Sequence, residues 1–389
     1  MSKQSAGGPP GPAMIVSYYF PPLNFPRSIR VHYLLRAFER MGRRVVGLTA
    51  RLENWGVDES LADLHGAEVV RVHSRLFRFS VRVHLLPHLF LGWLVLPTLR
   101  GIVEVHRRRP AYLLGVGLPF NSPIIACVLS KVSGVPLFLE LGDPWSMVPD
   151  PTHPIRGLKK ALVDAIEARV FAQARAVFVT TERVRQDYAR AYPDCADRIH
   201  IARNGFSGRA VAEAPGVPLP GEGARVLHMG AYYPIRVGLR PLMEAAGALR
   251  SEGTEVTFVF VGPFVGERPA TGLITLPQQD LRDAIGMMKS ADLLLAYGNR
   301  GGALIPSKVY WYVGTGRPTL IIVEGRDVME GELGGLPQVR VVQNDAAAIG
   351  AAMRELLSMR GGAAAPARFD WDLLDEDYLR LLDRLAAEG

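Results

Sequence analysis

Ser307 and Lys308 follow Pro306 at the start of a predicted helix that ends at Gly316. Proline is tolerated in a first helical turn, where its missing N–H would have no partner, and glycine favours the left-handed turn after the last one. The first N–H groups of a helix lack intrahelical partners, and the helix dipole is positive at that end. With a hydroxyl and an ammonium added, the segment predicts a diphosphate site. An ordinary helix with a surface lysine is the alternative.

Two further charged residues follow predicted buried strands. Asp143 comes after residues 137–141, where its carboxylate can orient or deprotonate a hydroxyl group or can cap the next turn. Arg236 lies in the loop after residues 225–229, where it can bind phosphate, and Arg240 competes for that role.

Motifs for metals and for other cofactors are missing from the sequence. The nine histidines form no HExxH or HxH pattern, and the two cysteines form no CxxC pair. The acidic triplet 375–377 lies in a predicted terminal helix, and Gly115-Val-Gly117 lacks the third glycine of a dinucleotide loop. We therefore expect no metal site and no bound cofactor. Two unpaired cysteines fit the reducing cytoplasm.

Apolar strands alternate with helices along the chain. Predicted strands span residues 13–19, 44–48, 69–72, 112–116, 137–141, 176–180, 225–229, 256–261, 292–296 and 319–323, and predicted helices span residues 30–41, 124–132, 158–173, 239–251, 280–289, 306–316 and 346–359. Continuous apolar strands of this kind are typical of parallel sheets covered on both faces. We expect an α/β protein with two Rossmann-like, doubly wound domains that bind ligands at the carboxyl ends of their strands, in a central cleft between the domains.

The domain boundaries follow from composition. The Pro- and Gly-rich segment 213–223 predicts a linker, and residues 1–13 predict a disordered N-terminus. The N-terminal domain is expected over residues 14–212, the C-terminal domain over 224–367 and a last helical segment over 368–389.

Positive charge is concentrated in the first half of the chain. Residues 1–210 hold 28 Lys and Arg against 16 Asp and Glu, whereas the remainder holds 17 against 22. A basic segment of this kind can bind nucleic acid, anionic lipid or a phosphorylated substrate. No zinc finger or RNA-recognition motif accompanies it, so we do not expect a nucleic-acid partner.

An apolar window over residues 83–99 is broken by His, Pro and Gly and is short for a membrane span. Arginines flank it from Arg71 to Arg109, which predicts either contact with an anionic membrane surface or a core-packing helical hairpin with a basic face. We expect a cytoplasmic protein, with peripheral attachment to the inner face of the cell membrane in the first case.

Six segments, in this order along the chain, resemble the GT-B glycosyltransferases and, among them, the family 4-like enzymes. They are the aromatic-Pro-Pro opening at 18–22 with the following arginines, the segment 139–145, the Asn-Gly turn at 203–206, the glycine-containing segment 229–236, the Val-Gly-Pro at 261–263, and residues 304–318. The resemblance covers nearly the whole chain from Met14. It implies a GT-B fold whose C-terminal helix crosses back to the N-terminal domain. It also implies transfer of a sugar, with retention, from a nucleotide diphosphate sugar to a glycan, lipid-linked or small-molecule acceptor. Because the sequence has no convincing DxD metal motif, we expect this transfer to be metal-independent.

The resemblance also implies roles for individual residues. Asp143 would be catalytic, and the donor diphosphate would bind Gly230, Arg236, Ser307 and Lys308. The nucleotide would contact Gly262, Pro263, Pro306 and Trp311, and the acceptor side would comprise Tyr19, Asn24, Arg27, Arg30 and Trp145. Arg30 could hold an acceptor phosphate or lie on the exposed face of its helix.

The chain departs from the family pattern at three places. Ala303 and Trp311 stand where the family usually carries two glutamates, the second of which binds the donor ribose. Residues 23–26 replace paired glycines, and Gly142 stands where the family often has Arg or His. A second interpretation is therefore a catalytically silent GT-B-like protein that binds a glycan or a partner. A third is a sugar-nucleotide epimerase of the same fold, although its usual acidic and histidine sites are not evident.

Overall fold

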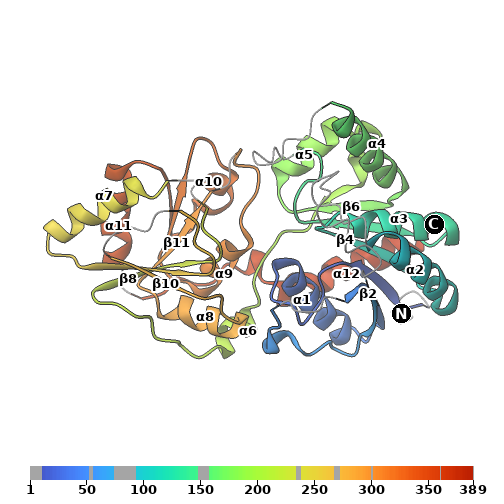
Figure 1. Cartoon of the computed structure of the whole chain (residues 1–389), viewed down its shortest axis with the longest axis horizontal. Coiled ribbons are helices and arrows are strands. Elements are labelled where there is room, and N and C mark those ends of the chain that lie inside the picture. Colours follow the sequence, from blue (N-terminus) through green and yellow to red (C-terminus); the bar gives the residue numbers. More distant parts are fainter. Residues whose placement is uncertain are drawn as a thin grey trace, which may run out of the picture. The chain divides into compact units, whose positions relative to one another are not determined.

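The computed structural model describes residues 11–51, 56–73, 93–147, 157–233, 238–266, 272–298, 301–359 and 361–388. The chain divides into two compact units, the first formed by Met1–Arg203 with Leu373–Gly389 and the second by Asn204–Asp372. Each unit contains one parallel sheet with helices packed on it (Figure 1). The predicted α/β class with two Rossmann-like domains is confirmed.

The first unit contains a seven-stranded sheet in the order β3-β2-β1-β4-β5-β6-β7. Its strands are β1 (Ala13–Ser17), β2 (Val45–Arg51), β3 (Glu68–His73), β4 (Tyr112–Gly117), β5 (Leu137–Leu141), β6 (Ala176–Val179) and β7 (Ile199–Ile201). Its helices are α1 (Pro26–Arg40), α2 (Val95–Arg108), α3 (Asn121–Ser133), α4 (Leu158–Gln173), α5 (Glu182–Ala191) and most of α12 (Trp371–Ala387), with short 3₁₀ turns at Glu59–Leu61 and Pro193–Arg198.

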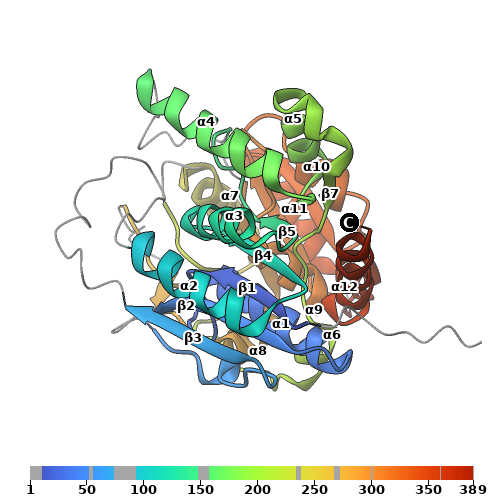
Figure 2. The same cartoon turned by 90° about the vertical axis from the view of Figure 1, so that its right-hand side faces the viewer.

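Helices cover both faces of this sheet, which is why its central strands are continuously apolar. Figure 2 shows α2 and α3 on one face and α1 and α12 on the other. The core on the α1 side includes Phe38 from α1, Phe138 from β5, and Leu379 and Leu382 from α12, all at most 1% exposed. The C-terminal helix is therefore part of the core of the first unit.

The second unit contains a six-stranded parallel sheet in the order β10-β9-β8-β11-β12-β13. Its strands are β8 (Ala224–Met229), β9 (Val256–Val261), β10 (Leu273–Leu276), β11 (Leu293–Tyr297), β12 (Thr319–Val323) and β13 (Val339–Gln343). Its helices are α6 (Gly208–Glu213), α7 (Arg240–Ser251), α8 (Leu281–Ser290), α9 (Ser307–Thr315), α10 (Val328–Leu333) and α11 (Ala346–Ser358), with a 3₁₀ turn at Ala367–Phe369. The helix predicted from Pro306 and Gly316 is α9: Pro306 is its N-cap, and Gly316 adopts φ +70° directly after it.

Several elements were not predicted, namely α2, α5, α6, α10, β7, β10 and β13. The three strands lie at sheet edges, where one flank of the strand has no neighbour. β10 is half-buried along its whole length, so it lacks the fully buried pattern that indicates a central strand. Part of the apolar window, residues 83–92, lies outside the described residues; residues 95–99 begin α2. Among the described residues, no helix has both the length and the apolar composition needed to cross a bilayer.

Candidate functional site

The order of strands in the second unit marks a site. From β8 the chain proceeds to β9 and β10 on one side, and from β11 to β12 and β13 on the other, so the order reverses between β8 and β11. In open parallel sheets, ligands bind beyond the carboxyl ends of the strands at such a reversal. Gly230 directly follows β8, Gly262 directly follows β9, and α9 follows β11.

The ammonium of Lys308, in the first turn of α9, lies at this reversal. Its Nζ is 3.0 Å from Nε2 of His228 in β8. A Cβ added to Gly230 would lie 3.7 Å from the same Nζ atom. Lys308 is half-buried, whereas His228 is 1% exposed. A positive charge is thus held beside the backbone of Gly230 at the positive end of a helix dipole.

The two glycines allow the loops after β8 and β9 to approach each other. Gly230 and Gly262 have φ values of +89° and +119°, which other residues rarely adopt. A Cβ on Gly262 would lie 3.0 Å from the carbonyl carbon of Gly230. The backbone N–H of Met229 donates to the hydroxyl of Tyr312 at 2.7 Å, which joins the end of β8 to α9. The backbone of Gly230, directly after β8, is exposed and can therefore contact a ligand.

In the first unit, Asp143 follows β5 and is half-buried. The segment after it is held in place by α4 and α5. The N–H of Trp145 donates to the hydroxyl of Tyr188 at 2.7 Å, and that hydroxyl donates to Oε1 of Glu167, also at 2.7 Å. The indole of Trp145 stacks on Phe120, with ring centroids 4.7 Å apart and an angle of 5° between the planes. Asp143 therefore stands at the start of a rigidly packed turn.

Glu167 is a buried acceptor for this turn. Its carboxylate also receives hydrogen bonds from Tyr192, at 2.9 Å, and from Ser146. Burial raises the pKa of Glu167, although the hydroxyl donors oppose that shift.

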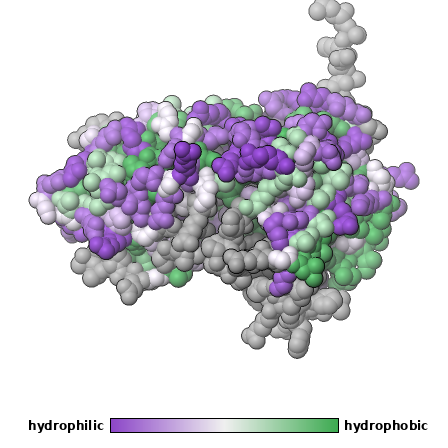
Figure 3. Space-filling model, turned by 90° about the horizontal axis from the view of Figure 1, so that it is seen from above, coloured by the Kyte–Doolittle hydropathy of each residue, from purple (hydrophilic) through white to green (hydrophobic). Residues whose placement is uncertain are grey.

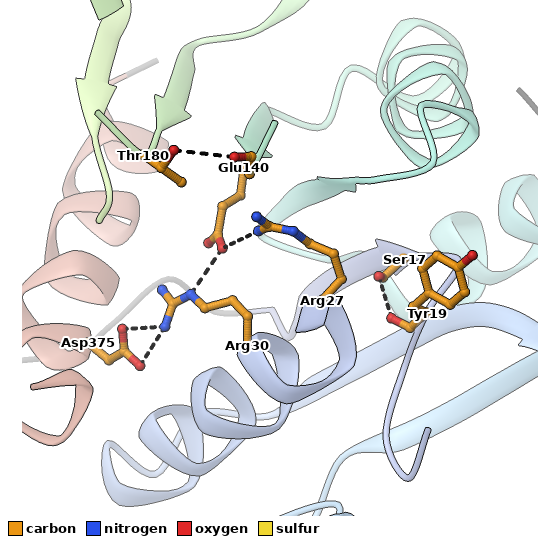
Figure 4. Close-up of polar contacts among 8 residues, drawn as sticks. Ser17, Tyr19, Arg27, Arg30, Glu140, Thr180 and Asp375 are labelled. Atoms are coloured by element: carbon orange, nitrogen blue, oxygen red, sulfur yellow. Dashed lines mark hydrogen bonds and ion pairs between the residues drawn. The ribbon is translucent and has the colours of Figure 1, made fainter. Parts of the chain in front are cut away.

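Arg27 and Arg30, two of the arginines of α1, lie beside a buried carboxylate of β5 (Figure 4). Nε of Arg30 donates to Oε1 of Glu140 at 3.0 Å, and its Nη1 donates to both oxygens of Asp375 in α12, at 2.7 and 2.8 Å. Nη1 of Arg27 lies 3.9 Å from Oε1 of Glu140. A Cβ on Gly142 would lie only 1.0 Å from Nη2 of Arg27. The guanidinium of Arg27 thus occupies the space that a side chain before Asp143 would need.

Residues 28–205 match the family described as Glycosyl transferase 4-like domain. This match covers less than half of the chain and makes that segment similar to a family 4-like glycosyltransferase domain, whereas the fold of the whole chain is GT-B. No curated protein matches the chain in sequence.

Solved structures share the fold at low sequence identity. The crystal structure of Anabaena Alr3699/HepE in complex with UDP and glucose superposes with a TM-score of 0.64 and 13% identity, covering 96% of this chain and 100% of that one. A glycosyltransferase from Rickettsia africae ESF-5 gives 0.63 and 10%, covering 98% and 100%. UDP-GlcNAc 2-epimerase from Methanocaldococcus jannaschii gives 0.53 and 11%, covering 96% and 99%. The GT-B fold is therefore common to transferases and epimerases.

Most of the predicted donor-side residues lie together at one end of the second sheet. Gly230, Gly262, Pro306, Ser307 and Lys308 gather at the carboxyl ends of β8 and β9 and the start of α9, and Pro263 is exposed beside Gly262. Arg236 lies outside the described residues. Its competitor Arg240 is 89% exposed at the side chain and pairs with Glu244 at 2.8 Å on α7.

Trp311 does not have the surroundings expected for a nucleotide contact. Its side chain is 4% exposed and packs edge-to-face against Trp371, with ring centroids 6.0 Å apart. A ring buried in this way packs the interior of the second unit, which does not suit the predicted contact with a nucleotide.

The structure also shows the surroundings of the predicted acceptor-side residues. Tyr19 is 7% exposed and stacks on Phe25 at 3.9 Å, and burial, followed by the neighbouring Tyr18, raises its pKa to about 12. Asn24 is half-buried, and its backbone N–H donates to the carbonyl of Gly56 at 3.1 Å. The alternative prediction that Arg30 lies on the exposed face of its helix is wrong, because Arg30 is 4% exposed. A guanidinium already paired with two carboxylates is also poorly suited to an acceptor phosphate.

Sequence reasoning missed His228 and Tyr312. His228 is the polar residue in the otherwise apolar stretch Val226–Met229, and that anomaly was the available signal. Over the described parts of the chain, no three His, Cys, Asp or Glu side chains group closely enough to hold a metal ion.

Proposed function

We propose that the protein transfers a sugar from a nucleotide diphosphate sugar to a hydroxyl acceptor. The observation that carries this proposal is the ammonium of Lys308 beside Gly230, at the first turn of α9 and at the strand reversal of the second sheet. The family match over residues 28–205 favours transfer over epimerisation. Structures of the same fold contain UDP or UDP-glucose, which makes UDP sugars the first donors to test.

The chemistry requires stabilisation of the leaving diphosphate. Negative charge develops on it as its bond to the anomeric carbon breaks, and a preorganised donor at such a position contributes about 2.7–4 kcal/mol. In this proposal Lys308, the N–H groups of Ser307 and Lys308 and the side chain of Arg236 supply that stabilisation. The protein's own cations then take the place of a metal ion, and no bound cofactor takes part.

On the acceptor side, we propose that Asp143 orients the acceptor hydroxyl and assists its deprotonation. Arg27 and Trp145 line the same strand end, since Arg27 packs on Gly142 and Trp145 follows two residues after Asp143. The proposed acceptor is a lipid-linked sugar or polysaccharide, with a small molecule as the alternative, and transfer proceeds with retention.

A lipid-linked acceptor would place the protein at the cytoplasmic face of a membrane. Val95, Leu99 and Val103 recur at helical spacing along α2 and are 55%, 58% and 55% exposed. Arg100 and Arg107 lie on the same helix, so apolar and basic side chains occur together there. Across the face shown in Figure 3, hydrophobic residues are interspersed with hydrophilic ones. We propose α2 as the contact with an anionic lipid surface.

Thermal unfolding with UDP, GDP, ADP, CDP and dTDP, each without metal, tests the donor. A nucleotide at about 100 times its dissociation constant stabilises the folded state by roughly 2.7 kcal/mol. Stabilisation by one nucleotide, followed by its release from the matching sugar donor with an acceptor present, would support transfer. Conversion of the donor to its epimer would instead identify an epimerase. No response to any nucleotide would favour the silent binding protein, for which the replacements at Ala303 and Trp311 are the main support.

A further inference from the structure

Among the contacts of His228, two polar ones indicate which of its ring nitrogens carries the proton. Its Nδ1 lies 3.0 Å from the carbonyl oxygen of Leu295 in β11, and its Nε2 lies 3.0 Å from Nζ of Lys308. A carbonyl oxygen can only accept a hydrogen bond, so Nδ1 carries the proton in this contact. The lone pair of Nε2 then accepts from the ammonium of Lys308. The histidine is neutral in this arrangement and faces the lysine as an acceptor.

We infer that His228 is a positioning residue for the proposed diphosphate site, which it serves by holding the ammonium of Lys308 beside Gly230. The inference rests on the proposed function. A lysine side chain loses rotamer entropy when it is fixed, and its compact charge imposes little orientation of its own. A buried acceptor that fixes the side chain before the ligand arrives removes part of that loss from the binding step.

The histidine is itself held by its surroundings. Its ring lies 4.8 Å from Phe260, 5.4 Å from Tyr297 and 6.4 Å from Tyr232, measured between ring centroids. It therefore connects β8, β11 and α9 at the strand reversal, where movement of any of the three would displace the ammonium.

The nature of the acceptor also matters for the ligand. A carboxylate in contact with Lys308 would cancel much of its charge, as Glu140 and Asp375 do for Arg30. The neutral imidazole holds the ammonium without adding a negative charge. The charge that faces a diphosphate is therefore reduced little by this contact.

The test compares UDP with uridine by calorimetry in wild type, His228→Phe and His228→Gln. Phenylalanine keeps the ring packing and loses both hydrogen bonds, so affinity for UDP is expected to fall roughly tenfold while affinity for uridine changes less than about twofold. Glutamine has a carbonyl that can accept from Lys308 and is expected to recover part of the loss. Tyr297→Phe is the matched control, because it alters a neighbouring aromatic ring without touching Lys308, and it should leave both affinities unchanged.

A double-mutant cycle with Lys308→Ala identifies the route of the effect. If His228 acts through Lys308, His228→Phe has no further effect on UDP affinity once Lys308 is alanine. The inference would be overturned if His228→Phe lowered UDP affinity equally in the wild-type and Lys308→Ala backgrounds, or if it lowered uridine affinity as much as UDP affinity. It would also be overturned if Lys308→Ala lost UDP affinity while both His228 variants kept it. Absence of UDP binding by the wild type would instead count against the UDP-dependent function proposed above. If His228→Phe does not fold, His228→Gln and its cycle with Lys308→Ala give the same decision.

Discussion

Nη1 of Arg30 donates hydrogen bonds to both carboxylate oxygens of Asp375 and joins the first helix of the chain to the last. The two side chains are 5% and 3% exposed, so the pair is shielded from solvent. Nε of Arg30 also binds Glu140 of β5, which extends the contact into the sheet. The C-terminal helix is thus fixed to the first unit by charge as well as by the apolar residues Leu379 and Leu382.

Removal of Asp375 should destabilise the first unit. Asp375→Ala leaves the buried guanidinium of Arg30 with one carboxylate fewer, and breaking a buried pair in this way costs about 3–5 kcal/mol. The free energy of unfolding from urea titration is the measurement. Asp377→Ala is the control on the same helix, since Asp377 is 77% exposed and pairs with the exposed Arg380. We expect a change below about 0.5 kcal/mol there, and equal effects of the two variants would contradict a structural role for the buried pair.

The fold could be predicted from the sequence because its central strands are buried on both faces. Leu137–Leu141 and Val256–Val261 were predicted with the bounds that the structure gives them. β10 and β13 were missed because edge strands contact fewer neighbours and carry a mixed pattern. The ordering of strands, and with it the reversal between β8 and β11, is not encoded in local periodicity.

The candidate site could be predicted only where a local motif exists. The helix start at Pro306, Ser307 and Lys308 was predicted correctly because a helix start has a recognisable composition. The contact between Lys308 and His228 joins residues 80 positions apart, and no sequence pattern encodes it. Arg30 was assigned to the acceptor because its partner Asp375 lies 345 positions away in the last helix.

Gly142 should not tolerate a side chain. A methyl group there would overlap the guanidinium of Arg27, so Gly142→Ala must displace that arginine. Overpacking of this kind typically costs about 1–3 kcal/mol. Gly247→Ala is the control, because nothing lies within 4 Å of a Cβ at this exposed helical position, and alanine there should stabilise by about 0.5–1 kcal/mol.

The origin of the Gly142 effect can be checked by removing the arginine. In an Arg27→Ala background the methyl group has room, so Gly142→Ala should cost less than in the wild type. A cost that does not change with Arg27 would show that the overlap is not its cause.

Acid should destabilise the first unit through His32. Burial, followed by the neighbouring His65, lowers the pKa of His32 to about 4, against about 6.5 in an unfolded chain. The unfolded state then binds the proton more tightly, so the stabilisation is fully present above pH 6.5 and is lost as the pH falls toward 4. Between pH 7 and pH 5 this amounts to about 2 kcal/mol.

The measurement is the free energy of unfolding of wild type and His32→Leu at pH 7 and pH 5. The difference between the two proteins should shift by about 2 kcal/mol, with the wild type losing more on acidification. Wild type and His32→Leu are compared with each other at each pH because Asp375 also titrates in this range. Burial raises the pKa of Asp375 to about 6, so its protonation stabilises the folded state of both proteins as the pH falls. Parallel curves for the two proteins would show that His32 is not the titrating group.

Binding to anionic vesicles should depend on α2. Leu99→Glu places a charge on the exposed apolar positions of that helix and should reduce the bound fraction in flotation with phosphatidylserine vesicles, by roughly tenfold in partition coefficient. Val265→Glu is the control, a comparable substitution at a 49% exposed residue of the second unit. The proposed membrane contact would be contradicted if both variants bound equally, or if binding did not depend on the presence of phosphatidylserine in the vesicles.

Lys308→Ala should greatly reduce transfer while leaving the fold intact. Lys308 is half-buried in the first turn of α9, and its aliphatic stem is not part of the buried core, so the thermal midpoint should change little. Loss of a preorganised cation at a leaving group lowers turnover by about 100- to 1,000-fold. Arg282→Ala removes an exposed cation from α8 of the same unit and should leave turnover unchanged. If transfer persists in Lys308→Ala, the diphosphate binds elsewhere, and the strand reversal between β8 and β11 would not be the donor site.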